Sequence, residues 1–491
     1  MALLFGLEPP SVASCRVLEL GCGSAGNLAS IALTLPGATC IGIDNAEQPI
    51  ARGLRLIAEA GLPNITLAVK SILDVDDEFG RFDFIICHGV YSWVPREVQD
   101  RILEVCARNL VDNGVAFVSY NAFPGWHLQR MVREMMQYHV RGFEDPVQRA
   151  QQARALLDLL ARFSESSDNY RQIIENEARS IQKLEDWYLL HDNLAAVNTP
   201  VYFHELVERA TEAGLQYLGP AVFPRREARL SPELTGILDG LSDRVRREQY
   251  LDFLSGRMFK RSLFCRQGPT IRSEPFADYV PRLFMSATAR PDSPHPDTAS
   301  EAVEKFRTTQ HDELSTNRPL LKTMLLRLAE LAPRTVSFDQ LWNDVVRRLP
   351  PADAARETAD ELARLVLFCN RANFVDLLGE AFEIETTVRE RPVVSPLARL
   401  QAREGELLTN LKHQIVSANE IVRQVLTRCD GAHDRPALQS ALAAHVEAEE
   451  LELHGPDGEK VSNPATLRDV EAALLEEILV DIAGQALLAP G

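Results

Sequence analysis

The chain lacks the features that would place it in a membrane or outside the cell. Its 491 residues contain no run of 18 consecutive apolar residues, so the sequence predicts no membrane span. The start of the chain has neither a basic stretch nor a long apolar core, and therefore does not predict a signal peptide. The eight cysteines are dispersed without a Cys-x-x-Cys pair, which is typical of reduced thiols. We therefore expect a cytoplasmic location.

Metal-ligand spacings and basic residues are also scarce. No group of His, Cys, Asp and Glu has the spacing of a metal site, so no bound metal is expected. The chain has 52 Lys and Arg against 70 Asp and Glu, a net charge of −18. Residues 395–491 hold 16 acidic residues and eight basic ones. Because an acidic surface repels phosphate, we expect no nucleic-acid partner and favour contact with a lysine-rich protein.

The most informative feature present is a glycine-rich turn near the start of the chain. Residues 17–20 predict a buried strand, and apolar residues at helical spacing follow in residues 28–35. Gly21, Gly23 and Gly26 lie between them in the pattern Gly-x-Gly-x-x-Gly. Such a turn brings backbone N–H groups against a bound ligand. On its own, the pattern fits a dinucleotide as well as S-adenosylmethionine (SAM).

Two carboxylates accompany this turn. Glu19 precedes Gly21 by two residues, and a carboxylate there suits a ligand with a cationic amino group better than it suits a pyrophosphate, which favours SAM. Asp44 ends a second predicted strand at residues 39–44, where it would accept hydrogen bonds from ribose hydroxyls. Asp44 is expected with either ligand and does not separate them.

The order of the following segments favours SAM more strongly. Residues 82–88 predict an apolar strand that opens with Phe-Asp, and residues 110–119 predict a helix end, a glycine turn and another strand. Over residues 15–125 the chain resembles class I SAM-dependent methyltransferases. The resemblance implies an α/β, Rossmann-like sheet of seven strands and SAM as the cofactor.

Four further phrases resemble a narrower family. They are residues 119–127, 189–194, 198–206 and 247–265. They resemble class I methyltransferases with a methyltransferase regulatory domain, a family that includes rickettsial protein-lysine methyltransferases. The resemblance implies a protein lysine as the methyl acceptor, a C-terminal winged helix, and a homodimer formed through the regulatory segment. A small-molecule (natural product) methyltransferase and a SAM-binding scaffold or sensor without turnover stay open as alternatives.

The scaffold alternative comes from the beginning of the chain. Relatives in this family generally carry a segment with aromatic residues that closes over the cofactor, ahead of a Leu-Phe-Gly-Leu phrase. Here Met1 lies almost on that phrase, at residues 4–7. We therefore expect SAM binding to persist and turnover to be weakened.

The first half of the chain divides into two predicted domains. Residues 1–160 are expected to form the methyltransferase domain. Residues 161–285 are expected to form a helical regulatory domain. The methionines at 131, 135 and 136 recur at helical spacing and indicate either core packing or the lining of a substrate tunnel.

The second half also divides into two predicted domains. A Pro- and Ser-rich stretch at residues 286–305 predicts a linker or an extended crossing at the start of a middle domain that extends to residue 395. Three helices and a hairpin at residues 374–386 would make this domain winged-helix-like. Residues 396–491 are expected to form a similar domain, with helices around 413–428, 436–446 and 468–485.

The methyltransferase resemblance also assigns roles to residues at the ends of the predicted strands. The expected cofactor contacts are Glu19, Gly21, Cys22, Gly23, Gly26, Asn27, Asp44, Asn45, Ser71, Ile72 and His88. The candidate catalytic residues are His88, Tyr91, Tyr120 and Asn121. We expect His88 and Tyr91 to take a proton or orient an amine, with a structural hydrogen bond as the alternative for His88. Tyr120 and Asn121 are expected to bind the acceptor.

Overall fold

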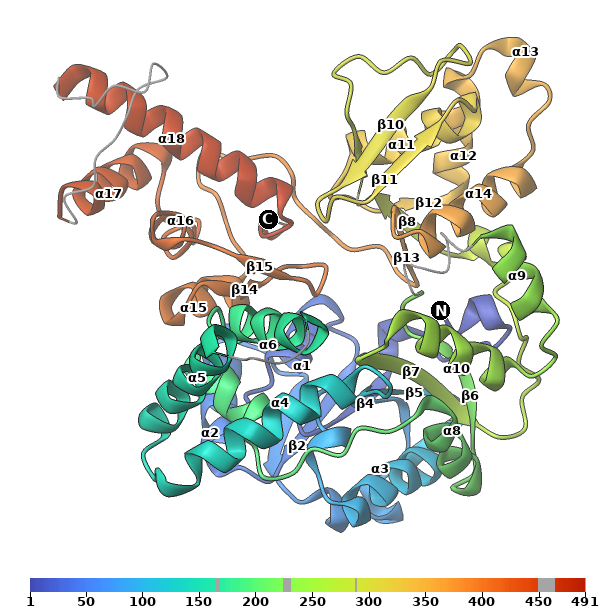
Figure 1. Cartoon of the computed structure of the whole chain (residues 1–491). Helices are drawn as coiled ribbons and strands as arrows, with labels where there is room; N and C mark the ends of the chain where they lie inside the picture. The colour runs from blue at the N-terminus through green and yellow to red at the C-terminus, as the bar shows by residue number, and fades with distance from the viewer. Residues whose placement is uncertain (164–167, 224–230, 288, 449–463, 491) are drawn as a thin grey trace.

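A sheet of seven strands forms the centre of the molecule. The computed structural model describes residues 1–163, 168–223, 231–287, 289–448 and 464–490 (Figure 1). The strands run in the order β3-β2-β1-β4-β5-β7-β6. Their bounds are Arg16–Leu20 (β1), Thr39–Asp44 (β2), Ile65–Val69 (β3), Phe82–Cys87 (β4), Leu110–Asn121 (β5), Leu215–Pro220 (β6) and Phe259–Arg266 (β7). The Rossmann-like sheet expected from the sequence is confirmed.

The strand directions create a ligand-binding edge. β1 to β5 are parallel, and β7 is antiparallel to both of its neighbours. β1 pairs with β2 on one side and β4 on the other, so the chain changes its direction of travel across the sheet there. Open α/β sheets bind ligands beyond the carboxyl ends of their strands at such a point.

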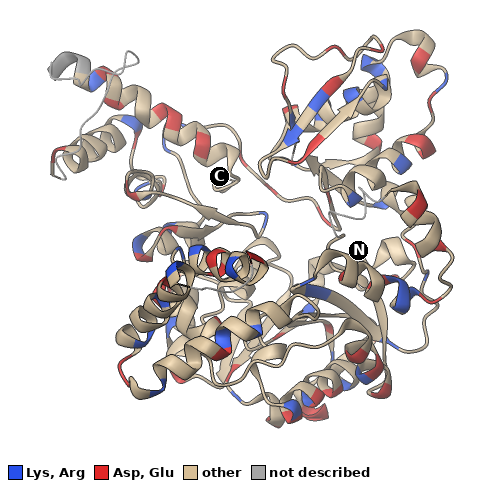
Figure 2. Cartoon of the chain, in the orientation of Figure 1, with Lys and Arg blue, Asp and Glu red and all other residues tan. Residues whose placement is uncertain are grey.

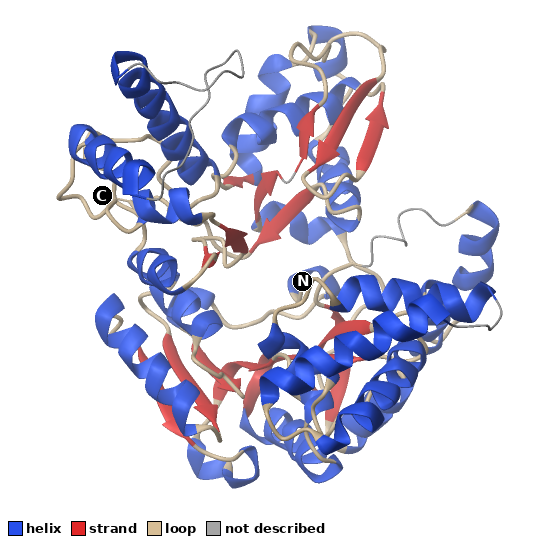
Figure 3. Cartoon of the chain, turned by 60° about the vertical axis from the view of Figure 1, so that its left-hand side comes forward, coloured by secondary structure: helices blue, strands red, loops and turns tan. Residues whose placement is uncertain are grey.

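Helices cover both faces of the sheet (Figure 3). α1 (Gly26–Thr34) and α2 (Glu47–Ala60) pack on one face, in a buried cluster that includes Leu28 and Ile50. α3 (Arg96–Asn109) and α8 (Phe203–Glu212) pack on the other face, in a cluster that includes Leu103 and Phe203. Burial of these apolar side chains fixes the sheet beneath the glycine turn.

The last two strands of the sheet differ from the expectation of a helical domain at residues 161–285. β6 and β7 lie in this part of the chain, together with α7 (Asp186–Tyr188), α9 (Pro232–Asp239) and α10 (Arg244–Ser255). Both strands are buried on both faces over most of their length, so their sequences lack the polar–apolar alternation that would reveal a strand. This segment therefore completes the sheet of the first domain.

Three helices follow β5 and form a separate layer. They are α4 (Trp126–His139), α5 (Pro146–Phe163) and α6 (Asp168–Ile181). Met136 is fully buried in their shared core with Leu157 and Ile174. Met131 and Met135 instead line a surface cavity of about 700 Å³. The three methionines thus do not form one tunnel lining.

The middle domain contains two small sheets in addition to helices. Its strands are β8 (Phe284–Ala287), β9 (Ala289–Pro291), β10 (Glu304–Thr308), β11 (Glu313–Thr316), β12 (Val336–Ser337) and β13 (Val375–Leu378). Its helices are α11 (Pro319–Leu331), α12 (Phe338–Arg348), α13 (Pro351–Ala354) and α14 (Ala359–Arg371).

One expectation for the middle domain is wrong. The hairpin at residues 374–386 is absent because β13 pairs with β8, and residues 379–386 form no strand. The stretch at residues 286–305 has strands only at its two ends, where β9 pairs with β10, and residues 292–303 between them form neither helix nor strand. Lys322, fully buried, donates to the carbonyls of Ser300 and Ala302 and so fixes the Pro- and Ser-rich turn.

The C-terminal domain packs against the layer formed by α1 and α2. Its elements are α15 (Pro396–Glu404), β14 (Leu407–Thr409), β15 (Ile415–Ser417), α16 (Glu420–Leu426), α17 (Arg435–Ala448) and α18 (Pro464–Gly484). The helix expected at 413–428 is divided into β15 and α16, because Asn419 caps a new helix there. Leu397 of α15 joins the buried cluster of α1 and α2.

The turn between β14 and β15 joins three parts of the molecule. His413 Nε2 lies 2.6 Å from Thr34 Oγ1 at the end of α1. Lys412 Nζ lies 2.9 Å from Ser286 Oγ and 3.2 Å from Asp376 Oδ2, both in the middle domain. Burial lowers the pKa of His413 to about 4, so the imidazole is neutral in this contact. This turn therefore joins the C-terminal domain both to α1 and to the middle domain.

The described residues include no helix that is long and apolar enough to cross a membrane. In the same part of the chain, no group of three or more His, Cys, Asp or Glu is placed to hold a metal ion.

Candidate functional site

The glycine turn leaves open space at the carboxyl edge of the sheet. Gly21 and Gly23 have positive φ angles of 71° and 56°. A Cβ on Gly21 would lie 2.4 Å from Val90 Cγ2, so the backbone passes this side chain too closely for any other residue. At Gly23 and Gly26 an added Cβ would meet no atom within 4 Å. These two glycines therefore border a space in which a ligand fits against the backbone.

Glu19 lies beneath this turn with one oxygen unsatisfied. Its carboxylate is 4% exposed, and Asn27 Nδ2 donates to Oε1 at 2.8 Å. Oε2 is buried and has no hydrogen-bond partner among the described residues. Burial raises the pKa of Glu19 to about 7. A buried carboxylate with a free oxygen is suited to a cationic amino group, and Asn27 acts by orienting it.

Asp44 holds the turn from the neighbouring strand. Its Oδ2 accepts the Gly23 N–H at 2.9 Å and its Oδ1 accepts the Ala46 N–H at 2.9 Å. A carboxylate has about four acceptor positions, so Asp44 keeps capacity for ribose hydroxyls. Asn45, next in the chain, is exposed at the same edge.

Ser71 and Ile72 follow β3 beside Asp44. The register pairs Asp44 with Val69, which brings both loops to one edge. Ser71 Oγ accepts the Leu73 N–H and caps a short helix at Ile72–Asp74. Ile72 packs against the buried cluster of β4 and α3. Both residues lie where a ligand extending from the glycine turn past Asp44 would end.

The backbone N–H of Cys22 donates to the Ile43 carbonyl at 2.9 Å and so holds the glycine turn on β2. A Cβ on Gly42 would lie 2.8 Å from Cys22 Sγ, so the thiol faces β2 in the core. Burial raises the pKa of Cys22 to about 12, and the thiolate is not available for chemistry at neutral pH.

Of the candidate catalytic residues, His88 is the one that is exposed at the carboxyl edge of the sheet. It follows β4, is exposed, and its Nδ1 lies 2.9 Å from Ser119 Oγ. The same hydroxyl accepts the Gly89 N–H at 2.8 Å. Partial burial and the charge of Arg261 lower the pKa of His88, so the ring is neutral near pH 7. Ser119 thus holds the ring and its loop together.

Tyr91 and Tyr120 are not at this edge, which corrects their expected roles. Tyr91 is 0% exposed and Tyr120 is 1% exposed, with their rings 6.3 Å apart in the core below α3. Tyr120 OH bonds to Ser262 Oγ at 3.0 Å. Burial raises the pKa of both phenols, so neither is placed or charged to act on a substrate.

Asn121 meets a residue that the sequence analysis missed. Its Nδ2 donates to Asn198 Oδ1 at 3.3 Å, and Asn198 Nδ2 is buried with no partner among the described residues. A cavity of about 290 Å³ lies beside this amide pair, with Phe123 and Trp126 in its wall. Trp126 packs edge-on against Trp93, 6.1 Å away. The end of β5 therefore carries polar amides within an aromatic surrounding.

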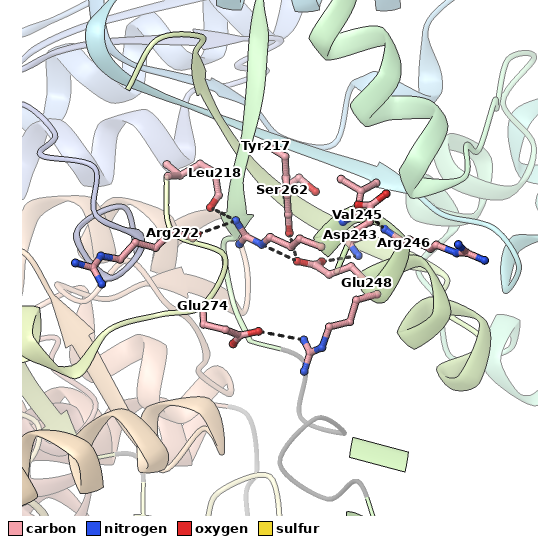
Figure 4. A network of polar contacts seen from close by, with 12 residues as sticks. Tyr217, Leu218, Asp243, Val245, Arg246, Glu248, Ser262, Arg272 and Glu274 are labelled. Carbon is pink, nitrogen blue, oxygen red and sulfur yellow. Dashed lines mark hydrogen bonds and ion pairs between the residues drawn. The ribbon is translucent and has the colours of Figure 1, made fainter. Parts of the chain in front are cut away.

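Buried charges support the acceptor side from below. Lys260 of β7 lies 3.0 Å from Glu248 and 2.9 Å from Asp252, all three being at most 8% exposed. Tyr217 and Glu248 point toward one another in Figure 4, where the phenol donates to Glu248 Oε1 at 2.7 Å. This network fastens α10 to β6 and β7 and so fixes the strand that borders β5.

Comparisons with known proteins agree with this architecture. Residues 17–114 match the family "Methyltransferase domain", residues 185–266 match "Predicted methyltransferase regulatory domain", and residues 390–487 match "PKMT, C-terminal winged helix domain". An uncharacterized protein of Rickettsia prowazekii, RP789, is 32% identical over 99% of this chain and 89% of its own length. PKMT2 from Rickettsia typhi, solved in complex with S-adenosylhomocysteine (AdoHcy), is 30% identical with a TM-score of 0.87, over 99% of this chain and 96% of its own. The chain belongs to the PKMT2 family of SAM-dependent methyltransferases.

Other methyltransferases resemble a smaller part of the chain. A ubiquinone biosynthesis O-methyltransferase of Dechloromonas aromatica is 30% identical, over 22% of this chain and 45% of its own. The shared part is about the length of the cofactor domain. The likeness to this enzyme does not extend to the middle and C-terminal domains.

The glycine turn of this methyltransferase fits its cofactor, SAM. The unsatisfied Glu19 oxygen matches the methionyl amino group, the open space at Gly23 and Gly26 matches its backbone contact, and Asp44 keeps acceptor capacity for the ribose. SAM supplies an electrophilic methyl group on a sulfonium. The protein's contribution to such a displacement is mainly positioning and exclusion of water.

Proposed function

We propose that this methyltransferase transfers the methyl group of SAM to the side-chain nitrogen of a protein lysine. The observation that carries the proposal is the extent of the likeness to PKMT2, which covers 99% of the chain, including the regulatory and winged-helix domains. A small-molecule methyltransferase, the alternative, is favoured by no comparable likeness outside the cofactor domain.

The acceptor side of the edge is suited to an amine. Asn121 and Asn198 offer amide oxygens, and the nearby Trp93 and Trp126 rings offer π faces that attract an ammonium group. His88 is exposed at the same edge, so a side chain from another protein reaches it. The cavity beside the amide pair is lined by aromatic rings and by charged side chains, among them Arg130, Arg133 and Glu134.

His88 is our candidate for the proton acceptor. A lysine ammonium must lose its proton before its nitrogen attacks a methyl group. The neutral His88 ring, held at Nδ1 by Ser119, presents Nε2 as a base when Nδ1–H donates to the serine hydroxyl. The cofactor roles of Glu19, Gly21, Cys22, Gly23, Gly26, Asn27, Asp44, Asn45, Ser71 and Ile72 belong to the same proposal.

The acidic charge of the C-terminal domain favours a protein partner over nucleic acid. Helix α18 carries five acidic residues and one basic residue, and the acidic residues, red in Figure 2, are distributed along the helix. We also propose a homodimer, to be tested by light scattering, and a cytoplasmic location, favoured by eight buried, unbonded cysteines.

Methyl transfer from tritium-labelled SAM tests the proposed acceptor. We expect label in the protein fraction of a lysine-rich acceptor mixture, and N-methyl-lysine after acid hydrolysis. Acceptors with acetylated lysines should take up no label. Label that appears in small molecules alone, or that survives lysine acetylation, contradicts a lysine acceptor.

A further inference from the structure

Arg261 is a cation at the acceptor end of the sheet edge with no role in the function proposed above. β5 and β7 pair so that Ser119 lies opposite Arg261 and Asn121 lies opposite Phe259. Residues directly opposite each other in an antiparallel pair project to the same face. Ser119 bonds to His88, and the Phe259 ring lies 6.4 Å from the His88 ring. Arg261 therefore shares a face with His88 and lies next to it.

The Arg261 guanidinium has no counter-charge within the described parts of the chain. The side chain is exposed, and none of the described residues forms a hydrogen bond or ion pair with it. Arg257, whose charge acts on it, is itself paired with Asp252 at 3.4 Å. Partial burial and Arg257 both lower the pKa of Arg261. An unmatched guanidinium beside a reaction site is suited to a carboxylate, because its planar fork matches the two carboxylate oxygens.

We propose that Arg261 determines specificity by receiving a carboxylate of the acceptor, so that the enzyme favours an amine with an acidic group beside it. This inference rests on the proposed function. With a protein lysine as the acceptor, the carboxylate is that of a neighbouring Asp or Glu.

The methionyl carboxylate of the cofactor is the other carboxylate to be considered as a partner of Arg261. Glu19, which is suited to the methionyl amino group, lies on β1, and β4 and β5 separate β1 from β7. At about 4.8 Å for each strand step, β1 and β7 are roughly 14 Å apart. The amino and carboxyl groups of methionine share one carbon atom, so a cofactor held by Glu19 keeps its carboxylate near β1. The acceptor is therefore the favoured source.

Paired peptides test this role of Arg261. One peptide carries Asp beside a single lysine, and the other carries Asn there. We would compare kcat/KM for both peptides with the wild-type enzyme, Arg261→Gln, Arg261→Glu and a control, Arg290→Gln, which alters an exposed arginine of the middle domain. We expect the wild type and the control to prefer the Asp peptide by roughly tenfold or more, the size of one charge-assisted hydrogen bond. Arg261→Gln should lose the preference and Arg261→Glu should reverse it; an equal Asp preference in all four proteins overturns the proposal.

Two binding measurements separate this inference from the proposed function. Calorimetry with AdoHcy should give the same Kd for Arg261→Gln and the wild type, whereas a Kd that weakens as much as kcat/KM assigns the carboxylate to the cofactor and overturns the proposal. If the wild type methylates no lysine peptide, the proposed function fails. In that case, N-acetylaspartate amide is titrated onto the AdoHcy complexes of the wild type and Arg261→Gln. Saturable binding that Arg261→Gln loses supports the role of Arg261. No binding, or equal binding by both proteins, overturns that role.

Discussion

On the β1 and β2 side of the sheet edge, the groups around the glycine turn are backbone N–H groups and two carboxylates. On the β5 and β7 side they are aromatic rings, an amide pair and several charged side chains, Arg261 among them. The first side is fixed by short main-chain hydrogen bonds to Asp44 and Ile43. The second is fixed by side chains from distant segments and by charges buried beneath β7. The cofactor side is therefore set by backbone shape, whereas the acceptor side changes with individual side chains and is where specificity resides.

The acceptor side should lose its support when Lys260 is removed. Lys260→Ala removes the buried cation that Glu248 and Asp252 share and leaves each with one more distant arginine, so we expect a loss of about 3 kcal/mol in the free energy of unfolding. Urea denaturation measures this change. The control Lys305→Ala breaks an exposed ion pair with Glu313 and should cost less than about 1 kcal/mol. Equal effects of the two substitutions would mean that the buried charges do not hold β7.

The cofactor side should show a pH dependence that arises from Glu19. Its folded-state pKa of about 7 lies above the usual value of 4.5, so the folded protein holds a proton that the unfolded chain releases. The stability of the ligand-free protein should therefore fall by about 2–3 kcal/mol as the pH rises from 4.5 to 7. Glu19→Gln should abolish that fall when denaturation is followed at pH 5 and pH 8.

Glu19 should also make the affinity for AdoHcy depend on pH, in the direction opposite to that of the stability. A cationic amino group favours ionised Glu19, so the wild-type affinity should increase from pH 6 to pH 8, while Glu19→Gln binds more weakly and without this increase. An affinity that is independent of pH in both proteins would remove Glu19 from the cofactor site. Calorimetry at the two pH values measures the difference.

The backbone character of the cofactor side predicts a contrast between two glycines. Gly23 and Gly61 both have positive φ, and a Cβ on either meets no atom within 4 Å. Gly23→Ala and Gly61→Ala should therefore both lose about 1 kcal/mol of stability. Only Gly23→Ala should weaken AdoHcy binding, by tenfold or more, because its methyl group enters the ligand space. Equal Kd values for the two variants would place the cofactor elsewhere.

The smallest expected effect concerns the positioning of His88. Ser119→Ala removes the hydroxyl that holds His88 and Gly89, and should lower kcat about threefold to tenfold with little change in KM. Combined with His88→Gln, it should lower kcat no further, because both substitutions act through one ring. Additive effects in the double variant would show that Ser119 acts independently of His88.

The cofactor side was predictable because its residues follow one another in the chain. Glu19, Gly23 and Asp44 end two successive strands, so segment order alone brings them to one edge. On the acceptor side, strand ends were correctly located but side-chain directions were not. Tyr120 lies between Ser119 and Asn121, and the alternation of a strand turns it into the core while its neighbours face the other way.

Other parts of the structure depend on long-range pairing that periodicity does not encode. Arg261 reaches His88 only because β7 pairs with β5, and the polar pattern of β7 gives no sign of that partner. The expected hairpin at residues 374–386 failed for the same reason, since the partner of β13 is β8, about ninety residues earlier. The contact between His413 and Thr34 joins residues 379 positions apart and is likewise not encoded in local sequence.

The position of β7 in the chain has a consequence for synthesis on the ribosome. β5 ends at Asn121, but the strand that covers its open side is complete only at Arg266. At about 5–20 residues per second, the growing chain exposes the β5 edge for roughly 10–30 s before β7 emerges. An unpaired, apolar strand edge is prone to aggregate during such a delay. We therefore expect a fragment that stops at residue 160 to accumulate as inclusion bodies, and release of the full chain to depend on a chaperone that shields nascent strands.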